Sequence, residues 1–158
     1  AEHWDNLTPL REGAYAAGRT QVDGVTEVSD LDQTEANKAV VLDLLTRMFI
    51  GGEKLDITQY ISPVQYQQHN PDTGDGLAGL QSLMKANAAK GIKMRYEEIG
   101  LVVAEGNFVL TGASGQLGGA PTAFYDLFRL EDGLIVEHWD VIAPIQIDNL
   151  PKGYPGKF

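Results

Sequence analysis

Residues 121–144 read PTAFYDLFRLEDGLIVEHWDVIAP, the stretch of the chain that carries the clearest prediction of secondary structure. Two runs rich in β-branched and aromatic residues flank the pair Asp132-Gly133. An Asp-Gly pair between alternating apolar runs predicts a β-hairpin. Because side chains alternate along a strand, the first run presents one face made of Phe124, Asp126, Phe128 and Leu130.

The second run of the hairpin separates its side chains in the same way. One face carries Val136, His138, Asp140 and Ile142, and the other carries Ile135, Glu137, Trp139 and Val141. If the polar faces of the two runs meet, one hollow holds Asp126, His138 and Asp140 against apolar walls. Burial raises the pKa of a carboxyl group and a neighbouring imidazole exchanges protons, so this hollow suits acid–base chemistry.

The composition is that of one globular domain. The chain has 158 residues, of which 43% are hydrophobic and 22% charged,. Its net charge of −10 repels phosphate groups, so we expect neither nucleic acid nor membrane as a partner,. The absence of cysteine excludes disulfides and thiolate catalysis,. The chain begins at Ala1, so both a cytoplasmic chain and an exported one with its leader removed fit the sequence.

The chain predicts helices first and strands afterwards. Helical periodicity predicts a helix over 34–50, a short helix over 54–61 and a helix over 76–90,. Asp32 and Glu35 have the spacing of a capping box ahead of the first. Alternation predicts strands over 92–104, with a bulge at Glu97-Glu98, over 108–117 and in both arms of the hairpin,. This order is typical of an α+β domain whose helices cover one face of an antiparallel sheet.

We divide the chain into an arm, one domain and a strap. Residues 1–30 show no sustained period and predict an extended N-terminal arm. This arm is either a tail on the surface or a segment that docks through Trp4, Leu7 and Tyr15. The domain spans 31–146, and the prolines and glycines of 147–158 predict an irregular C-terminal strap,.

Four pieces of sequence, in this order, resemble a known family. They are Tyr66-Gln67-Gln68-His69-Asn70-Pro71, Asp75-Gly76, Phe128-Arg129-Leu130-Glu131-Asp132-Gly133 and Ile135-Val136-Glu137-His138-Trp139-Asp140-Val141. The combination resembles the SnoaL-like polyketide cyclases, a group within the nuclear-transport-factor-two-like superfamily. The likeness covers roughly residues 34–146 and leaves the arm outside it.

The resemblance implies a cone-shaped α+β fold, with N-terminal helices packed on a curved antiparallel sheet that encloses a pocket. It also implies a homodimer formed through the outer face of the sheet. Relatives include cyclases, isomerases and proteins that only bind small molecules, so the fold alone gives no function. Limonene-epoxide hydrolase, another relative, needs an Arg-x-Asp pair on the strand that here spans 108–117. That strand holds neither residue, which disfavours epoxide opening.

The resemblance to the cyclases implies a carboxylate that removes a proton next to a carbonyl group, followed by aldol closure. Asp140 matches the late-strand acid of the family and is our candidate base, with His138 orienting it. His69 or Asp126 would stabilise the enolate. We expect the substrate, a small hydrophobic carbonyl compound, to contact Asn70, Tyr66, Phe124 and Phe128.

Each candidate also has a structural interpretation. A strand histidine is often a satisfied core residue, and a buried acid is often paired with backbone or tyrosine. His69, His138, Asp126 and Asp140 are ligand types that suit zinc or iron, but no H-x-H or H-E-x-x-H spacing supports a metal site, so we expect no metal and no cofactor. Three hypotheses remain: a cofactor-independent lyase or isomerase, a module that binds an apolar ligand without reaction, and a structural dimer.

Overall fold

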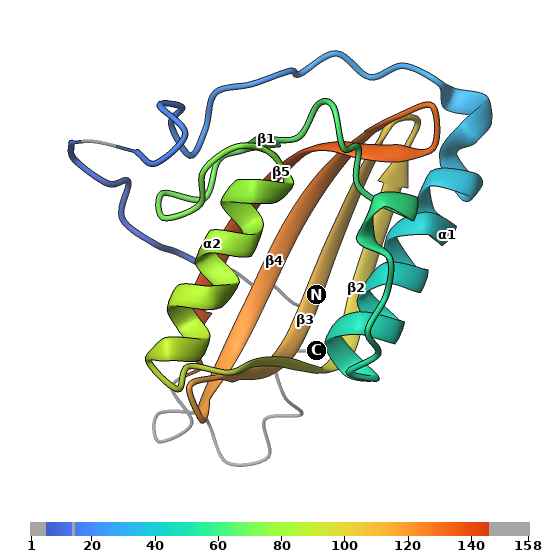
Figure 1. The fold of residues 1–158 in the computed structure, drawn as a ribbon. Helices are drawn as coiled ribbons and strands as arrows, with labels where there is room; N and C mark the ends of the chain where they lie inside the picture. The colour runs from blue at the N-terminus through green and yellow to red at the C-terminus, as the bar shows by residue number, and fades with distance from the viewer. Residues whose placement is uncertain (1–5, 14, 146–158) are drawn as a thin grey trace.

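The computed structural model describes residues 6–13 and 15–145 of the chain (Figure 1). Two helices cover one face of a five-stranded sheet, in which the strand order is β1-β5-β4-β3-β2. The order runs from one edge strand to the other without closing into a barrel. This is the α+β architecture that the sequence predicted, with both helices on the concave face of the sheet.

The first helix extends over the range predicted from the sequence. α1 spans Thr34–Leu44 and continues as one π-helical segment, Leu45–Ile50. Val41, Leu44 and Leu45 are buried on its inner side, where the apolar stripe had placed them. The predicted capping box does not form: Asp32 lies in a 3₁₀ turn, Leu31–Gln33, ahead of the helix, and its carboxylate accepts from the Gln33 side chain at 3.0 Å.

The predicted helix over 54–61 is wrong. Only one 3₁₀ turn forms, Ile57–Gln59, with the Asp56 carboxylate accepting from the backbone N–H of Thr58. The chain then turns toward the sheet, where Ile61 forms an isolated parallel bridge with Ile135. Tertiary pairing with a strand therefore overrides the short helical pattern.

The second helix, α2, spans Gly76–Ala89 and begins and ends within a residue of the prediction. None of its residues is buried. Leu77 and Leu80 pack partly against the core, whereas Met84 is exposed. α2 therefore covers the concave face loosely, in contrast to α1.

The sheet consists of four long antiparallel strands and one short parallel strand. The bounds are β1 Gln67–Gln68, β2 Met94–Glu105, β3 Phe108–Leu117, β4 Ala120–Glu131 and β5 Leu134–Pro144. β1 pairs in parallel with β5 at the edge. The predicted bulge in β2 is confirmed by a register shift between Tyr96 and Glu98. Gly115 lies so close to the backbone of β2 that a Cβ there would stand 2.1 Å from the Arg95 carbonyl oxygen.

A register shift between β4 and β5, at Arg129 and Leu130, alters one predicted face of the hairpin. Beyond it Leu130 pairs with Ile135, and both are completely buried in the hydrophobic core. Ile135 was expected on the outer face with Trp139. The prediction was wrong because an extra residue in one strand reverses the alternation that follows.

The described part of the N-terminal arm runs from the start of α1 across the sheet edge near β1 (Figure 1). It is bonded at several points, including Ser29 to Asn107 and Ala16 to Pro71. Leu7 is exposed, Tyr15 bonds within the arm, and Trp4 and the strap at 147–158 lie outside the described residues. Within the described residues, no helix has the length and apolar character needed to cross a membrane.

Candidate acid–base site

The hairpin brings three of the predicted residues together on the concave face. Asp126 of β4 is the cross-strand partner of Asp140 of β5. His138 Nε2 lies 3.0 Å from Asp126 Oδ1. One ligand atom from each of the three residues lies within 4.8 Å of the others. The three side chains that period-two alternation placed on one face therefore form a cluster of two carboxylates and one imidazole.

Asp126 is buried and accepts hydrogen bonds at both oxygens. Besides the bond to His138, its Oδ2 accepts from the hydroxyl of Tyr96 at 2.7 Å. Burial and the charge of Asp126 hold the pKa of Tyr96 well above its ordinary value, so this hydroxyl remains a donor. Both oxygens of Asp126 therefore have partners within the protein.

Asp140 has a different environment. Its Oδ2 accepts from the Asn70 side-chain amide at 2.7 Å, so Asn70 orients it, rather than His138 as the sequence suggested. Burial raises the pKa of Asp140 above its ordinary value, and the charge of Asp126 adds to this effect. The charge of His138 and the bond from Asn70 oppose it. Asp140 is thus the carboxylate whose affinity for a proton is increased.

His138 is fixed on three sides. Its ring stacks on Phe128 with centroids 4.9 Å apart. Burial lowers the pKa of His138, but the hydrogen bond and the charge of Asp126 outweigh that effect and raise it overall. The amide of Gln68 faces the remaining ring nitrogen. The imidazole therefore pairs with Asp126 rather than with Asp140.

Tyr66 supplies a hydroxyl group beside the two carboxylates. Its oxygen accepts a hydrogen bond from the Gln68 amide at 2.9 Å. Burial raises its pKa, as do the nearby charges of Asp140 and Asp126, so the hydroxyl stays protonated. Its own hydrogen has no acceptor among the described residues, which leaves it free to donate to a ligand.

His69 does not join this cluster, and the prediction that it shares one cavity with His138 is wrong. Its Nε2 lies 2.9 Å from Glu137 Oε1, on the outer face of β5. Its ring stacks on Trp139 with centroids 4.5 Å apart. Gln68 and His69 alternate as strand residues in β1 and its extension, so they lie on opposite faces of the sheet.

The outer face holds a second buried polar cluster, made of His69, Glu137 and Arg129 with part of the arm. Glu137 is completely buried and accepts from Arg129 Nε at 2.7 Å. His69 Nδ1 lies 2.8 Å from the carbonyl oxygen of Thr20 and 3.0 Å from Asp23 Oδ1. This cluster fastens the arm to the sheet, which is a structural role for His69.

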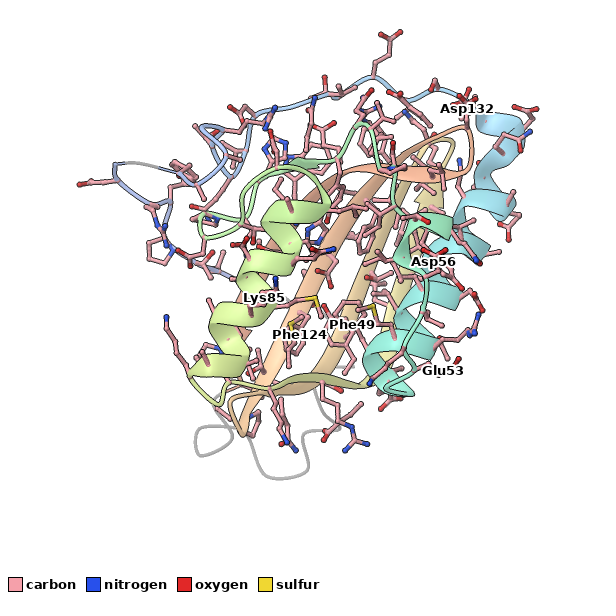
Figure 2. All side chains as sticks on the ribbon, in the orientation of Figure 1. Phe49, Glu53, Asp56, Lys85, Phe124 and Asp132 are labelled. Carbon is pink, nitrogen blue, oxygen red and sulfur yellow. The ribbon has the colours of Figure 1, made fainter. Side chains whose placement is uncertain are left out.

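Aromatic rings form the apolar wall beyond the polar cluster. Tyr96 stacks on Phe124 at 4.4 Å and lies 5.1 Å from Phe49, measured between ring centroids. Figure 2 shows Phe49 and Phe124 between α1 and α2 in front of the sheet. A cavity of about 820 Å³ adjoins Phe49 at the end of the strands where β2 begins. Asp126, His138 and Asp140 do not line it, so the Phe49–Tyr96 pair stands between that cavity and the carboxylates.

Among the described residues, the trio Asp126, His138 and Asp140 is the one grouping with the donor types and spacing for a metal ion,. Its atoms are already engaged, because His138 Nε2 bonds to Asp126 and Asp140 Oδ2 bonds to Asn70. We assign no ion to it.

Gln68 and Tyr96 belong to the site but were missed from the sequence. The signal for Gln68 is the alternation of Gln67-Gln68-His69, in which neighbouring side chains point to opposite faces. Tyr96 sits next to the bulge in β2, where alternation alone gives an uncertain face. The hydroxyl of Thr111, the partner of Asp126 on β3, is buried without a hydrogen-bond partner in the described residues.

No protein-family model and no curated protein matches the sequence. Solved structures do match. A Kribbella flavida protein with the provisional name ketosteroid isomerase is 12% identical, with a TM-score of 0.54 over 78% of this chain and 90% of that one. A nuclear-transport-factor-two-like protein from Burkholderia xenovorans is 20% identical, with a TM-score of 0.51 over 70% and 91%.

A third neighbour, from Acidithiobacillus ferrooxidans, has the provisional name polyketide cyclase. It is 14% identical, with a TM-score of 0.50 over 68% of this chain and 87% of that one. At these identities the similarity concerns the fold and not the reaction. The chain therefore has the fold of the SnoaL-like and nuclear-transport-factor-two-like proteins, the group that its sequence motifs resemble.

Proposed function

We propose that this protein is a cofactor-independent lyase or isomerase that moves a proton next to the carbonyl group of a small hydrophobic compound. The observation that carries the proposal is the cross-strand pair of Asp126 and Asp140, a buried and a half-buried carboxylate with different partners. Environments that separate the proton affinities of two acids divide them into different roles.

In this reaction Asp140 is the base. It takes the proton from carbon, and the electrons of the broken C–H bond move onto the carbonyl oxygen to give an enolate. Burial supports this role because it raises the pKa of Asp140 toward neutrality,. Asn70 keeps the carboxylate in place through its bond to Oδ2.

Tyr66 is the donor to the enolate oxygen. Its hydroxyl hydrogen is free, and its neutral form persists because its pKa is raised. A donor already aimed at the oxygen stabilises the charge as it develops, without reorganisation. If a carbon–carbon double bond adjoins the deprotonated carbon, the resulting dienolate takes the proton back from Asp140 at the far end of that bond. Otherwise the enolate attacks a second carbonyl group, whose oxygen then takes the proton from Asp140. The first outcome is isomerisation and the second is aldol closure.

Proton exchange tests this proposal without knowledge of the natural substrate. A panel of hydrophobic cyclic ketones is incubated with the protein in D₂O, and loss of the α-proton signal is followed by NMR. We expect catalysed exchange with at least one ketone. Asp140→Asn keeps the shape but removes the base, so the rate should fall by about a hundredfold or more.

The matched control is Asp32→Asn, because Asp32 is exposed just before α1, where it accepts from the neighbouring Gln33 side chain, and lies outside the cluster. It should exchange at the parent rate. An Asp140→Asn protein that exchanges as fast as the parent would refute the role of Asp140. Ketones that stabilise the fold against heat without any exchange would favour the non-catalytic binding module.

A further inference from the structure

Gln68 occupies the point where the edge strand meets the acid–base cluster. In β1 it is the register partner of His138, and the next backbone N–H, of His69, donates to the His138 carbonyl oxygen at 3.0 Å. Gln68 is 3% exposed, so its amide must find partners inside the protein,. Those partners are groups that the proposed reaction uses or orients.

The two ends of the Gln68 amide both reach the same nitrogen of His138. Nε2 lies 3.1 Å and Oε1 3.2 Å from His138 Nδ1. Nε2 also donates to the Tyr66 hydroxyl oxygen at 2.9 Å. Oε1 also accepts from the backbone N–H of Asn70 at 3.3 Å. Since a backbone N–H can only donate, this bond fixes which end of the amide is the oxygen.

An imidazole needs different partners in its two protonation states. Neutral His138 with its proton on Nε2, facing Asp126, needs a donor at Nδ1. Protonated His138 carries hydrogen on both nitrogens and needs an acceptor at Nδ1 instead. A carboxylate at this place would serve only the second state, and an aliphatic side chain would serve neither. An amide with both ends within reach serves both.

We propose that Gln68 is a positioning residue whose amide holds the imidazole of His138 against Asp126 in both its neutral and its protonated form. The ring can then gain and lose a proton without moving from its stack on Phe128. This inference rests on the proposed function only where it concerns the effect of His138 on Asp140 as the base. The charge on His138 lowers the pKa of Asp140, so the state that Gln68 permits sets the strength of the base.

The groups around His138 are few and can be named. Asp126 faces it from β4, Asp140 from its own strand and Tyr66 from the segment before β1. The charges of Asp126 and Asp140 favour the protonated ring, and the charge of His69, across the sheet, opposes it. Gln68 is uncharged and both ends of its amide reach Nδ1, so substituting it changes the hydrogen bonds at that nitrogen.

NMR titration of the ring nitrogens tests the proposal on the whole protein without any substrate. The variants are Gln68→Glu and Gln68→Met, compared with the parent. Gln68→Glu gives Nδ1–H a charged acceptor, so the pKa of His138 should rise by roughly one unit or more. Gln68→Met removes both partners from a buried ring, so the pKa should fall by roughly one unit.

Two controls separate positioning from general effects. Gln67→Glu adds the same charge one residue earlier, in register with Glu137 on the outer face, and should leave the titration of His138 close to that of the parent. His69 provides a second histidine signal on the opposite face, and neither Gln68 variant should shift it. The contacts of the His138 ring with Phe128 should persist on both sides of the parent titration.

The proposal is overturned if His138 titrates at the same pH in all three proteins. It is also overturned if the ring leaves Phe128 when it is protonated, or if it keeps one protonation state wherever the protein is folded. None of these three results would bear on the role of Asp140 as the base, which the exchange experiment tests separately. Conversely, failure of proton exchange would leave the titration result unchanged.

Discussion

Residues of the same type differ here through their partners. His138 and His69 sit on opposite faces of one strand pair, and each is bonded to a buried carboxylate. His138 pairs with Asp126 inside the cone and belongs to the proposed reaction. His69 pairs with Glu137 on the outer face and holds the arm. The same chemical pair therefore belongs to the proposed site in one place and holds the arm in the other.

The pH dependence of stability follows from His69. Burial lowers its pKa, but bonds to Glu137, the Thr20 carbonyl and Asp23 outweigh this and raise it. A raised pKa in the folded state contributes stability that is complete below the unfolded value, about 6.5, and is lost as pH rises through the folded value. The difference in free energy of unfolding between the parent and His69→Gln should therefore shrink as pH increases above about 6.5.

Urea denaturation of both proteins at a series of pH values measures this difference. Taking the difference removes the contribution of His138, which titrates in both proteins. A difference in free energy of unfolding that stays constant from pH 6 to pH 9, or that grows, would contradict the raised pKa of His69 in the folded protein.

Helices and strands could be predicted from the sequence where a single apolar periodicity extends over many residues. α1, α2 and the four long strands follow from apolar periodicity, and the sheet brings Asp126, His138 and Asp140 together because alternation specifies their faces. The segments that failed are short. The segment at Ile57–Gln59 forms only one turn because the residues that follow it pair with β5. β1 is two residues long, which is too short for a periodicity to be recognised. His69 and Gln68 were misplaced or missed for that reason.

The arm was predicted as extended, but its closest contact depends on a shape that no periodicity encodes. Gly24 has φ of 117° and lies against the outer cluster. A Cβ there would stand 2.6 Å from both Glu137 Oε1 and Trp139 Cζ2. Contacts between a glycine and side chains more than 100 positions away arise only from the fold.

Gly24→Ala should therefore displace the arm from the sheet. The expected cost is about 1–3 kcal/mol in the free energy of unfolding, because strain and overpacking act together. Gly18→Ala is the matched control, since Gly18 also has positive φ, 74°, but a Cβ there meets nothing within 4 Å. Denaturant unfolding and amide exchange of residues 20–29 measure the effect. Equal losses in the two variants would show that backbone strain alone explains them.

In the molecule as a whole, the outer face of the sheet carries a row of apolar side chains. Val103, Leu110, Leu127 and Trp139 are successive register partners across β2, β3, β4 and β5. The arm bonds to Trp139 at one end of this row, whereas Val103 at the other end is 54% exposed. An apolar row open to water marks an interaction surface. We propose that two copies of the chain pair through it.

Light scattering at micromolar concentration should give a mass near twice the 17.2 kDa of one chain. Val103→Asp places a charge in the row and should yield the single-chain mass with an unchanged circular dichroism spectrum. Met84→Asp places the same charge on an exposed position of α2, over the opposite face of the sheet, and should remain dimeric. A parent protein that is monomeric under these conditions would rule out the dimer.

The central claim is that the fold gives Asp140 a raised affinity for protons by burying it beside Asp126. Titration of the Asp140 carboxyl carbon by ¹³C NMR measures this directly, in the parent and in Asp126→Asn. We predict that the pKa of Asp140 in the parent lies above the ordinary value of 3.8, and that it falls once the charge of Asp126 is removed. An Asp140 that titrates at or below 3.8 in the parent, or that is unaffected by Asp126→Asn, would contradict it.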